Sequence, residues 1–385
     1  MLSPAPAQVD RRVPAWRSVA VSGGLATVAL LSGTVLLAVG ADNAGVSWKE
    51  APGYAHWDSA HYLSIAERGY DLVSCAELGL YRPDDWCGNA GWFPGYPATI
   101  RAVSRLGLPA VEAGVVISHL ALFGVLFLVA WFLRALPLAD RLVAVLGASF
   151  FPGAVYYRAV FPISLTLLGV LACLLALRSR RWVVAGLLSS VAVAAYPQGV
   201  ALGAAAIPFF LSGLRRDRRD LRVAVGFLAL VTAAFLAVLL MYDIRVGRWD
   251  AYFLVQAKYD PGLHFPVTEF LHHLGTTTAP TGETRAPGAQ TALVAVVLLA
   301  VFTAAWWHRA RLGTFHAAVV AVCALTWLMP LSLGGELSLY RREGLVLPAV
   351  LLLPLLPRWL AVGLVVASAA VMVPISRQFF AGVLV

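Results

Sequence analysis

Charged residues are scarce in this chain, and lysine is almost absent. Asp, Glu, Lys and Arg make up 13% of its 385 residues, against about a quarter in soluble domains. The basic residues are arginines except for Lys49 and Lys258. The chain also lacks a glycine-rich nucleotide loop, a zinc-ligand signature and an internal repeat. These absences argue against a soluble nucleotide-dependent enzyme, and 60% hydrophobic residues with a mean hydropathy of +0.79 predict an integral membrane protein.

Apolar runs long enough to cross a bilayer recur along the whole chain. A hydrocarbon core of about 30 Å takes roughly 20 helical residues. The runs predict an all-α polytopic fold of about eleven transmembrane helices, near residues 18–40, 111–133, 141–158, 162–178, 182–196, 198–214, 222–243, 290–307, 313–332, 344–357 and 359–376. We therefore expect a tail at 1–17, a single membrane domain at 18–385, and two long loops within it at 41–110 and 244–289.

The distribution of charge predicts the orientation of these helices, because short cytoplasmic loops are enriched in Lys and Arg. With the N-terminus in the cytoplasm, that side holds 16 bases and 4 acids, and the other side 13 bases and 16 acids. Both long loops then lie outside. The net charge of +9 is explained by orientation and anionic lipid, so nucleic acid is not an expected partner. The preference for arginine suggests a GC-rich genome, and we expect a bacterial plasma membrane.

Four cysteines divide into two pairs by location. Cys173 and Cys323 fall in apolar runs and are expected to pack as small hydrophobic residues. Cys75 and Cys87 share the first outer loop, where an oxidising compartment permits a disulfide. Their spacing alone leaves bridged and free cysteines equally open.

A polar and aromatic segment, His56 to Tyr70, follows the first apolar run. Its apolar residues recur at helical spacing and predict a short helix along the membrane surface, ended by Gly69. Asp58 is the candidate catalytic residue, since a carboxylate at a partly desolvated surface can take the proton from an attacking hydroxyl. The alternative is that Asp58 only caps the helix that starts near Ser59.

Other polar residues are candidates for binding a phosphosugar. His61, three residues after Asp58, can contact a phosphate or a sugar hydroxyl. Arg341, Arg342 and Arg158, expected at helix ends on the outer face, can bind phosphate through paired hydrogen bonds. Structural alternatives exist for each: His61 as a plain interfacial residue, and arginines that snorkel to the interface or pair with Glu336 and Glu343.

A divalent metal site is a less favoured alternative. It would combine Asp58 and a histidine with the acidic pair Asp84 and Asp85. Adjacent acids in a proline-containing loop are more often simply solvated, so we expect no metal.

Several segments, in order, resemble the PIG-V-like mannosyltransferases, which are relatives of the second mannosyltransferase of glycosylphosphatidylinositol assembly and members of the GT-C glycosyltransferases. The resemblance covers nearly the whole chain. It rests on Trp57-Asp58-x-x-His61-Tyr62, Trp92-Phe93-Pro94-x-Tyr96-Pro97, Phe151-Pro152, Arg180-Arg181-Trp182, Pro197-Gln198-Gly199, Gly247 through Gln256, and Ser338 with Arg341 and Pro348. Three positions depart from the family pattern, in which Ile163 would be Glu, Tyr196 Arg and Arg342 Tyr.

The resemblance implies a GT-C-like bundle whose active site lies in the large first extracytoplasmic loop. It implies a polyprenyl-phosphate mannose donor, Asp58 as the base, and no general need for a metal. The acceptor would be a hydroxyl of a glycolipid, a glycan or a protein. Substrate-binding residues are expected among Trp57, His61, Tyr62, Tyr96, Gln256, Arg158, Arg341 and Arg342.

Two other functions fit a chain of this kind. A transporter or flippase of a lipid-linked sugar would also have many helices, aromatic residues and arginines, but it should place charges or broken helices near the midplane. A catalytically inactive membrane subunit with the same fold is the third reading, and the three departures keep it open.

Overall fold

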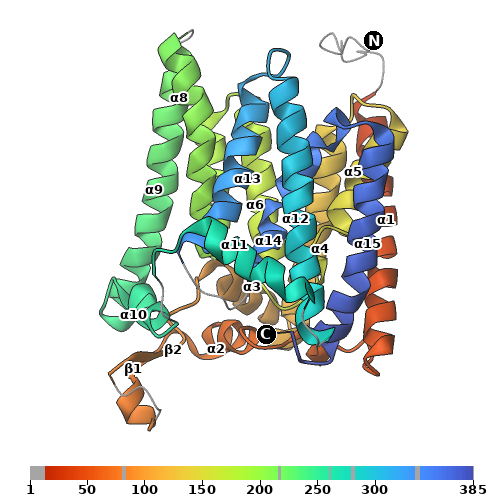
Figure 1. The fold of residues 1–385 in the computed structure, drawn as a ribbon. Coiled ribbons are helices and arrows are strands. Elements are labelled where there is room, and N and C mark those ends of the chain that lie inside the picture. The colour runs from red at the N-terminus through yellow and green to blue at the C-terminus, as the bar shows by residue number, and fades with distance from the viewer. Residues whose placement is uncertain are drawn as a thin grey trace.

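The computed structural model describes residues 14–79, 84–215, 218–259, 262–278, 282–333 and 339–384. Within these residues it is a helical bundle with one small β-hairpin (Figure 1). The hairpin pairs β1 (Leu72–Ser74) antiparallel with β2 (Trp86–Gly88). The fold is therefore all-α, as the composition predicts.

Seven segments are long and apolar enough to cross a membrane. They are α1 (Ala15–Asn43), α4 (Ala110–Phe132), the pair η4 (Pro197–Ala205) and α8 (Ala206–Arg215), α9 (Arg218–Val246), α12 (Gly282–Trp307), α13 (Thr314–Ser332) and α15 (Arg358–Phe380). Two further apolar helices, α6 (Ile163–Arg178) and α7 (Trp182–Ala195), are shorter. By length and composition the chain is a multi-pass membrane protein, and the number of eleven crossings stays a prediction.

Close approach between neighbouring helices depends on small residues. A Cβ on Gly169 of α6 would lie 2.8 Å from the backbone nitrogen of Ala192 in α7. A Cβ on Gly40 of α1 would lie 2.9 Å from the carbonyl oxygen of Val373 in α15. Small residues are the usual means by which helices pack inside membranes, where no hydrophobic force drives them together.

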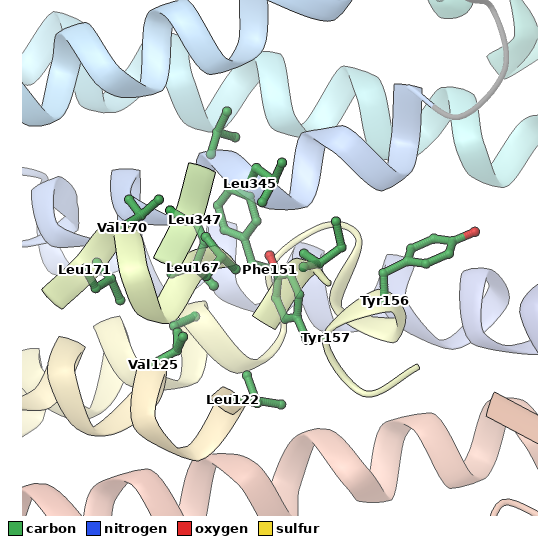
Figure 2. Packing of buried hydrophobic residues seen from close by; sticks show 14 of the residues in the cluster. Leu122, Val125, Phe151, Tyr156, Tyr157, Leu167, Val170, Leu171, Leu345 and Leu347 are labelled. Carbon is green, nitrogen blue, oxygen red and sulfur yellow. The ribbon is translucent and has the colours of Figure 1, made fainter. Parts of the chain in front are cut away.

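The centre of the bundle is built by α4, α6 and η6 (Gly344–Leu355), a 3-10 helix of twelve residues that contains Pro348. Buried side chains from these elements gather with residues of the segment 150–162, which precedes α6, as Figure 2 shows for Leu122, Val125, Phe151, Tyr156, Tyr157, Leu167, Val170, Leu171, Leu345 and Leu347. Runs of 3-10 helix longer than one turn are uncommon. Proline helps to explain this one, because it cannot donate an α-helical hydrogen bond.

The third predicted helix, 141–158, is wrong in its second half. Helix α5 (Leu138–Ser149) ends before Pro152 and Gly153, and a separate 3-10 turn, η3 (Ala154–Tyr157), follows. Gly153 has a φ of 86°, which an L side chain rarely adopts. The tyrosines at 156 and 157 are completely buried, so they do not form an interfacial belt.

The second long loop, predicted at 244–289, is largely helical. It contains α10 (Ala251–Ala257), α11 (Pro266–Gly275) and η5 (Thr276–Thr278), and α12 already begins at Gly282. Similarly, the first loop contains η1 (Ala51–Tyr54), α2 (Ser59–Arg68), η2 (Cys75–Leu78) and α3 (Gly95–Ser104).

One end of the bundle carries the elements of the first loop. Figure 1 shows α2, α3, the hairpin and α10 at this end, and the junction of α8 with α9 at the opposite end. At that junction Arg180 Nη1 lies 2.8 Å from Asp220 Oδ1, which brings together two loops that the charge distribution assigned to the same face. The disulfide between Cys75 and Cys87 is present and ties η2 to β2.

Candidate functional site

Asp58 lies immediately before the first residue of α2. It occupies the N-cap position, but its side chain makes no capping hydrogen bond. The start of the helix is instead fixed by Ser59, whose hydroxyl donates to the carbonyl oxygen of Val160 at 3.0 Å. The helix itself agrees with the sequence prediction, whereas capping does not explain the Asp58 carboxylate.

The carboxylate is paired with an arginine from the far end of the sequence. Arg341 Nη1 donates to Asp58 Oδ2 at 2.6 Å, across 283 positions of the chain. The Arg341 side chain is 10% exposed and that of Asp58 is 30% exposed. The pair therefore lies at the edge of the buried region, with the carboxylate on its more open side.

Arg341 is carried by the short helix α14 (Leu339–Glu343), which buried polar groups of α12 hold in place. Gln290 Nε2 donates to the Tyr340 carbonyl oxygen at 2.7 Å and to Glu343 Oε2 at 2.9 Å. Gln290 is completely buried, and Glu343 is 1% exposed. Glu343 thus anchors α14 to α12. The sequence alternative, in which Glu343 pairs with an arginine, is not what the structure shows. Glu336 lies outside the described residues.

Aromatic rings pack around the residues next to the pair, and the Arg341 guanidinium lies over the Phe161 ring at 5.6 Å from its centroid. His61 stacks on Trp92, with ring centroids 3.5 Å apart and planes 13° apart. Phe379 of α15 packs edge-on against Trp57 at 5.5 Å and against His56 at 4.9 Å. Aromatic rings offer flat apolar faces beside polar edges, so the surroundings of the pair combine apolar and polar surfaces.

The backbone immediately before Asp58 is in a sparsely populated conformation. Trp57 has a φ of 48°, a left-handed value that is unusual for a bulky residue. Residues held in this way need surrounding contacts to maintain them and often occur at functional sites. Here the contacts are with His56 and Phe379.

The charges at the site affect several titratable groups around it. Burial lowers the pKa of His61, and the Asp58 charge only partly offsets this, so the imidazole is neutral at pH 7. Burial also raises the pKa of Tyr259, and the Asp58 carboxylate adds to the rise. The pKa of Arg341 is held above its usual value: burial lowers it, but the Asp58 charge and nearby tyrosines outweigh that effect. The site thus keeps a charged arginine beside a neutral histidine.

The remaining predicted site residues are placed more deeply or farther along the same end. Tyr62 and Tyr96 are buried, with ring centroids 5.6 Å apart, and the Tyr96 hydroxyl contacts Ser118 Oγ at 2.9 Å. Gln256 Nε2 donates to the Gly91 carbonyl oxygen at 3.0 Å and so ties α10 to the first loop. The contacts of these three side chains are with other parts of the fold.

Within the described residues, the two other arginines form no ion pair or hydrogen bond with Asp58. Arg158, which was expected at a helix end on the outer face, is completely buried and donates to Ser149 Oγ at 3.1 Å and to the Ala154 carbonyl oxygen at 3.2 Å. Arg342 is half-buried, and its charge acts on Tyr252 of α10. The structure thus brings together Asp58, Arg341, His61 and Trp57, and leaves Arg158 inside the bundle.

Trp92 lies in the aromatic-proline segment that the sequence had already singled out. Three other contributors to the site did not stand out from the sequence, and of these Phe379 and Tyr259 have no local signal. Gln290 offered one signal, a polar residue at the start of an apolar run. Among the residues that the structure describes, no three His, Cys, Asp or Glu side chains are grouped closely enough to hold a metal ion.

Comparison of the sequence with models of known protein families and with curated proteins found no match. The functional argument for this chain therefore depends on its own residues and their geometry.

Proposed function

We propose that this chain is an integral membrane glycosyltransferase that moves a sugar from a polyprenyl-phosphate donor to a hydroxyl acceptor. The main support is the pairing of Asp58 with Arg341 among aromatic rings at one end of the bundle. A base and a phosphate ligand are the two groups that such a transfer needs most, and both residues were candidates from the sequence. The resemblance to PIG-V-like enzymes favours mannose as the sugar.

The proposed reaction is a single displacement with inversion at the anomeric carbon. The acceptor oxygen forms a bond to that carbon while the bond from the carbon to the phosphate oxygen breaks. The acceptor proton goes to the Asp58 carboxylate, and the electron pair of the broken bond leaves with the polyprenyl phosphate. Arg341 lies beside the base and can stabilise the phosphate charge that develops.

Neighbouring groups have supporting roles in this proposal. The neutral His61 on Trp92 can donate to or accept from a sugar hydroxyl. Arg342 adds a second cation for phosphate. The prenyl chain lies against apolar helix surfaces, in an eleven-span topology with the N-terminus in the cytoplasm of a bacterium and the site outside.

The test is to incubate the purified protein in nanodiscs with radiolabelled polyprenyl-phosphate mannose and a bacterial lipid extract. Label recovered in a new glycolipid, glycan or protein, with release of polyprenyl phosphate, supports the proposal. If no sugar is transferred to any acceptor in the extract, and the donor is not hydrolysed either, the proposed reaction is wrong.

A transporter of lipid-linked sugars is the second candidate, because two apolar segments are not regular α-helices. Both η4 and η6 are 3-10 segments within apolar sequence, and Arg158 is buried inside the bundle. Broken helices and intramembrane charges are typical of transport paths. Movement of a fluorescent lipid-linked sugar across sealed vesicles, without transfer, would favour this reading, and neither activity would favour an inactive subunit.

A further inference from the structure

A separate hollow lies at the other end of α2 from Asp58. It has a volume of about 280 Å³ and is lined by Ala66, Glu67, Arg101, Ser104, Arg105 and Ala110. These residues come from the last turn of α2, the end of α3 and the first residue of α4. Glu67 is nine positions after Asp58, or about 13 Å along an α-helix, so the hollow is distinct from the Asp58 site.

Three side chains offer hydrogen-bond donors to the hollow. Ser104 Oγ is buried and has no hydrogen-bond partner. Arg101 uses Nε and Nη2 to donate to the carbonyl oxygens of Ala66 and Ile65, at 2.6 and 2.8 Å, which leaves Nη1 available. The exposed Arg105 guanidinium has no ion pair or hydrogen bond within the described part of the chain.

The N-terminus of α4 adds to this positive environment. Ala110 is the first residue of this helix of 23 residues, and the unpaired N–H groups of a first helical turn favour anions. Two arginines, one hydroxyl and a helix N-terminus together form a set of donors suited to a phosphate group.

Glu67 gives the hollow a carboxylate as well. Its side chain is exposed and has no salt bridge to either lining arginine in the structure as described. Glu112, in the first turn of α4, is the other acid nearby. A ligand that carries only negative charge would leave the Glu67 carboxylate uncompensated, whereas a phosphate joined to an ammonium would satisfy both signs.

The hollow is also next to a segment that faces the membrane. Leu106 is 82% exposed and Leu108 is 39% exposed, in the loop that leads from α3 into the membrane-spanning α4. Exposed leucines beside the end of a spanning helix are expected to lie in the acyl-chain boundary. The donors of the hollow are then at headgroup depth.

We propose that this hollow binds a phospholipid headgroup in which a phosphate is joined to a primary ammonium. The phosphate contacts Arg101, Arg105 and the Ser104 hydroxyl, and the ammonium contacts the Glu67 carboxylate. The bound lipid holds the C-terminal end of α2 at a fixed depth. This inference is independent of the proposed glycosyl transfer, since it needs neither donor nor acceptor.

The test measures which lipids stay with the purified protein. The intact protein is placed in nanodiscs with equal parts of phosphatidylethanolamine, phosphatidylcholine and phosphatidylglycerol, and retained lipid is identified by native mass spectrometry. We expect phosphatidylethanolamine to be enriched about tenfold over phosphatidylcholine, whose quaternary ammonium cannot donate to Glu67. Equal retention of the three lipids would overturn the proposal.

Variants assign the effect to the hollow. Arg105→Gln should abolish the enrichment, and Glu67→Gln should shift it toward phosphatidylglycerol. The matched control is Arg68→Gln, because Arg68 is in the same turn but donates to Ser64 at 3.2 Å and does not line the hollow. Enrichment that survives Arg105→Gln, or that Arg68→Gln removes equally, would contradict the assignment.

A soluble ligand separates the headgroup from the bilayer. Glycerophosphoethanolamine, added in excess, should displace the retained lipid, while inorganic phosphate should do so only weakly because it cannot contact Glu67 favourably. Equal displacement by both would mean that the hollow is a simple phosphate site, and would refute the role of Glu67.

Discussion

The pairing of Asp58 with Arg341 can be measured as a coupling free energy. The perturbation is a double-mutant cycle made of Asp58→Asn, Arg341→Gln and the double variant. At 2.6 Å the hydrogen bond is charge-assisted. Two unit charges about 4 Å apart interact by about 4 kcal/mol at an effective dielectric constant of about 20, and the cost of desolvation reduces this. We therefore expect a coupling of about 1–3 kcal/mol.

The two single substitutions should have unequal effects. Arg341 is 10% exposed and Asp58 is 30% exposed, so Asp58→Asn leaves the more buried charge without its partner. We expect Asp58→Asn to cost about 2–4 kcal/mol of unfolding free energy, and Arg341→Gln about 1–2 kcal/mol. The double variant should be no less stable than Asp58→Asn, since it removes both charges.

The assay is equilibrium unfolding of the purified protein in mixed micelles, with the same cycle on a control pair. Arg358 and Asp140, at 2.8 Å, have side chains that are 59% and 28% exposed. That exposed pair should give a coupling below about 1 kcal/mol. If the Asp58 and Arg341 substitutions are additive within about 0.5 kcal/mol, or couple no more strongly than the control pair, the pairing does not contribute to the fold as described.

Three further outcomes are expected. Burial lowers the pKa of His61 below 6.5, so the unfolded chain binds the proton first, and stability should fall as the pH drops through 6.5 and level off below the folded-state pKa. Burial also lowers the pKa of His56, so His61→Gln should reduce this pH dependence, in unfolding curves between pH 7.5 and 5.5, without abolishing it. An unchanged slope would contradict the prediction. Reduction of the disulfide, or Cys75→Ser with Cys87→Ser, should lower the local stability of the hairpin by about 3 kcal/mol for a loop of this length. The hairpin should then be cleaved faster by protease while the remaining chain stays intact. Equal proteolysis rates would argue against the bridge. Gln290→Leu removes the hydrogen-bond donor to two buried oxygens, one of them on Glu343, and should lower the free energy of unfolding by about 2–4 kcal/mol. Gln290→Glu should be tolerated better at low pH than at high pH, and identical unfolding curves at both pH values would refute this role of Gln290.

The sequence was most informative where a pattern is local. The spacing of Ile65 and Ala66 with Tyr62 predicted α2, and Gly69, with a φ of 94°, ends it. The apolar runs predicted the positions of the long helices because the thickness of the bilayer sets a minimum length for each apolar run.

Local sequence patterns did not predict a change of backbone conformation within an apolar run. The run from 141 to 158 contains Pro152 and Gly153, but its apolar length was given more weight than this turn signal, so the break there and the burial of Arg158 were missed. Interior arginines are rare enough in membranes that an interfacial position was the better guess.

The candidate site shows the same division. Asp58 and Arg341 were both selected by chemistry, but a separation of 283 residues carries no information about contact. The stack of His61 on Trp92 and the packing of Phe379 depend on tertiary structure alone. Residue types were therefore predictable, and their mutual placement was not.

The role of Asp58 is tested most directly by the initial rate of sugar transfer from radiolabelled polyprenyl-phosphate mannose, with wild-type and Asp58→Asn protein in identical nanodiscs. Asp42→Asn is the matched control, because Asp42 is an exposed acid at the end of α1. Loss of a catalytic base should lower the rate at least about 100-fold, with no change for the control. A rate for Asp58→Asn within about threefold of wild type would contradict the central claim.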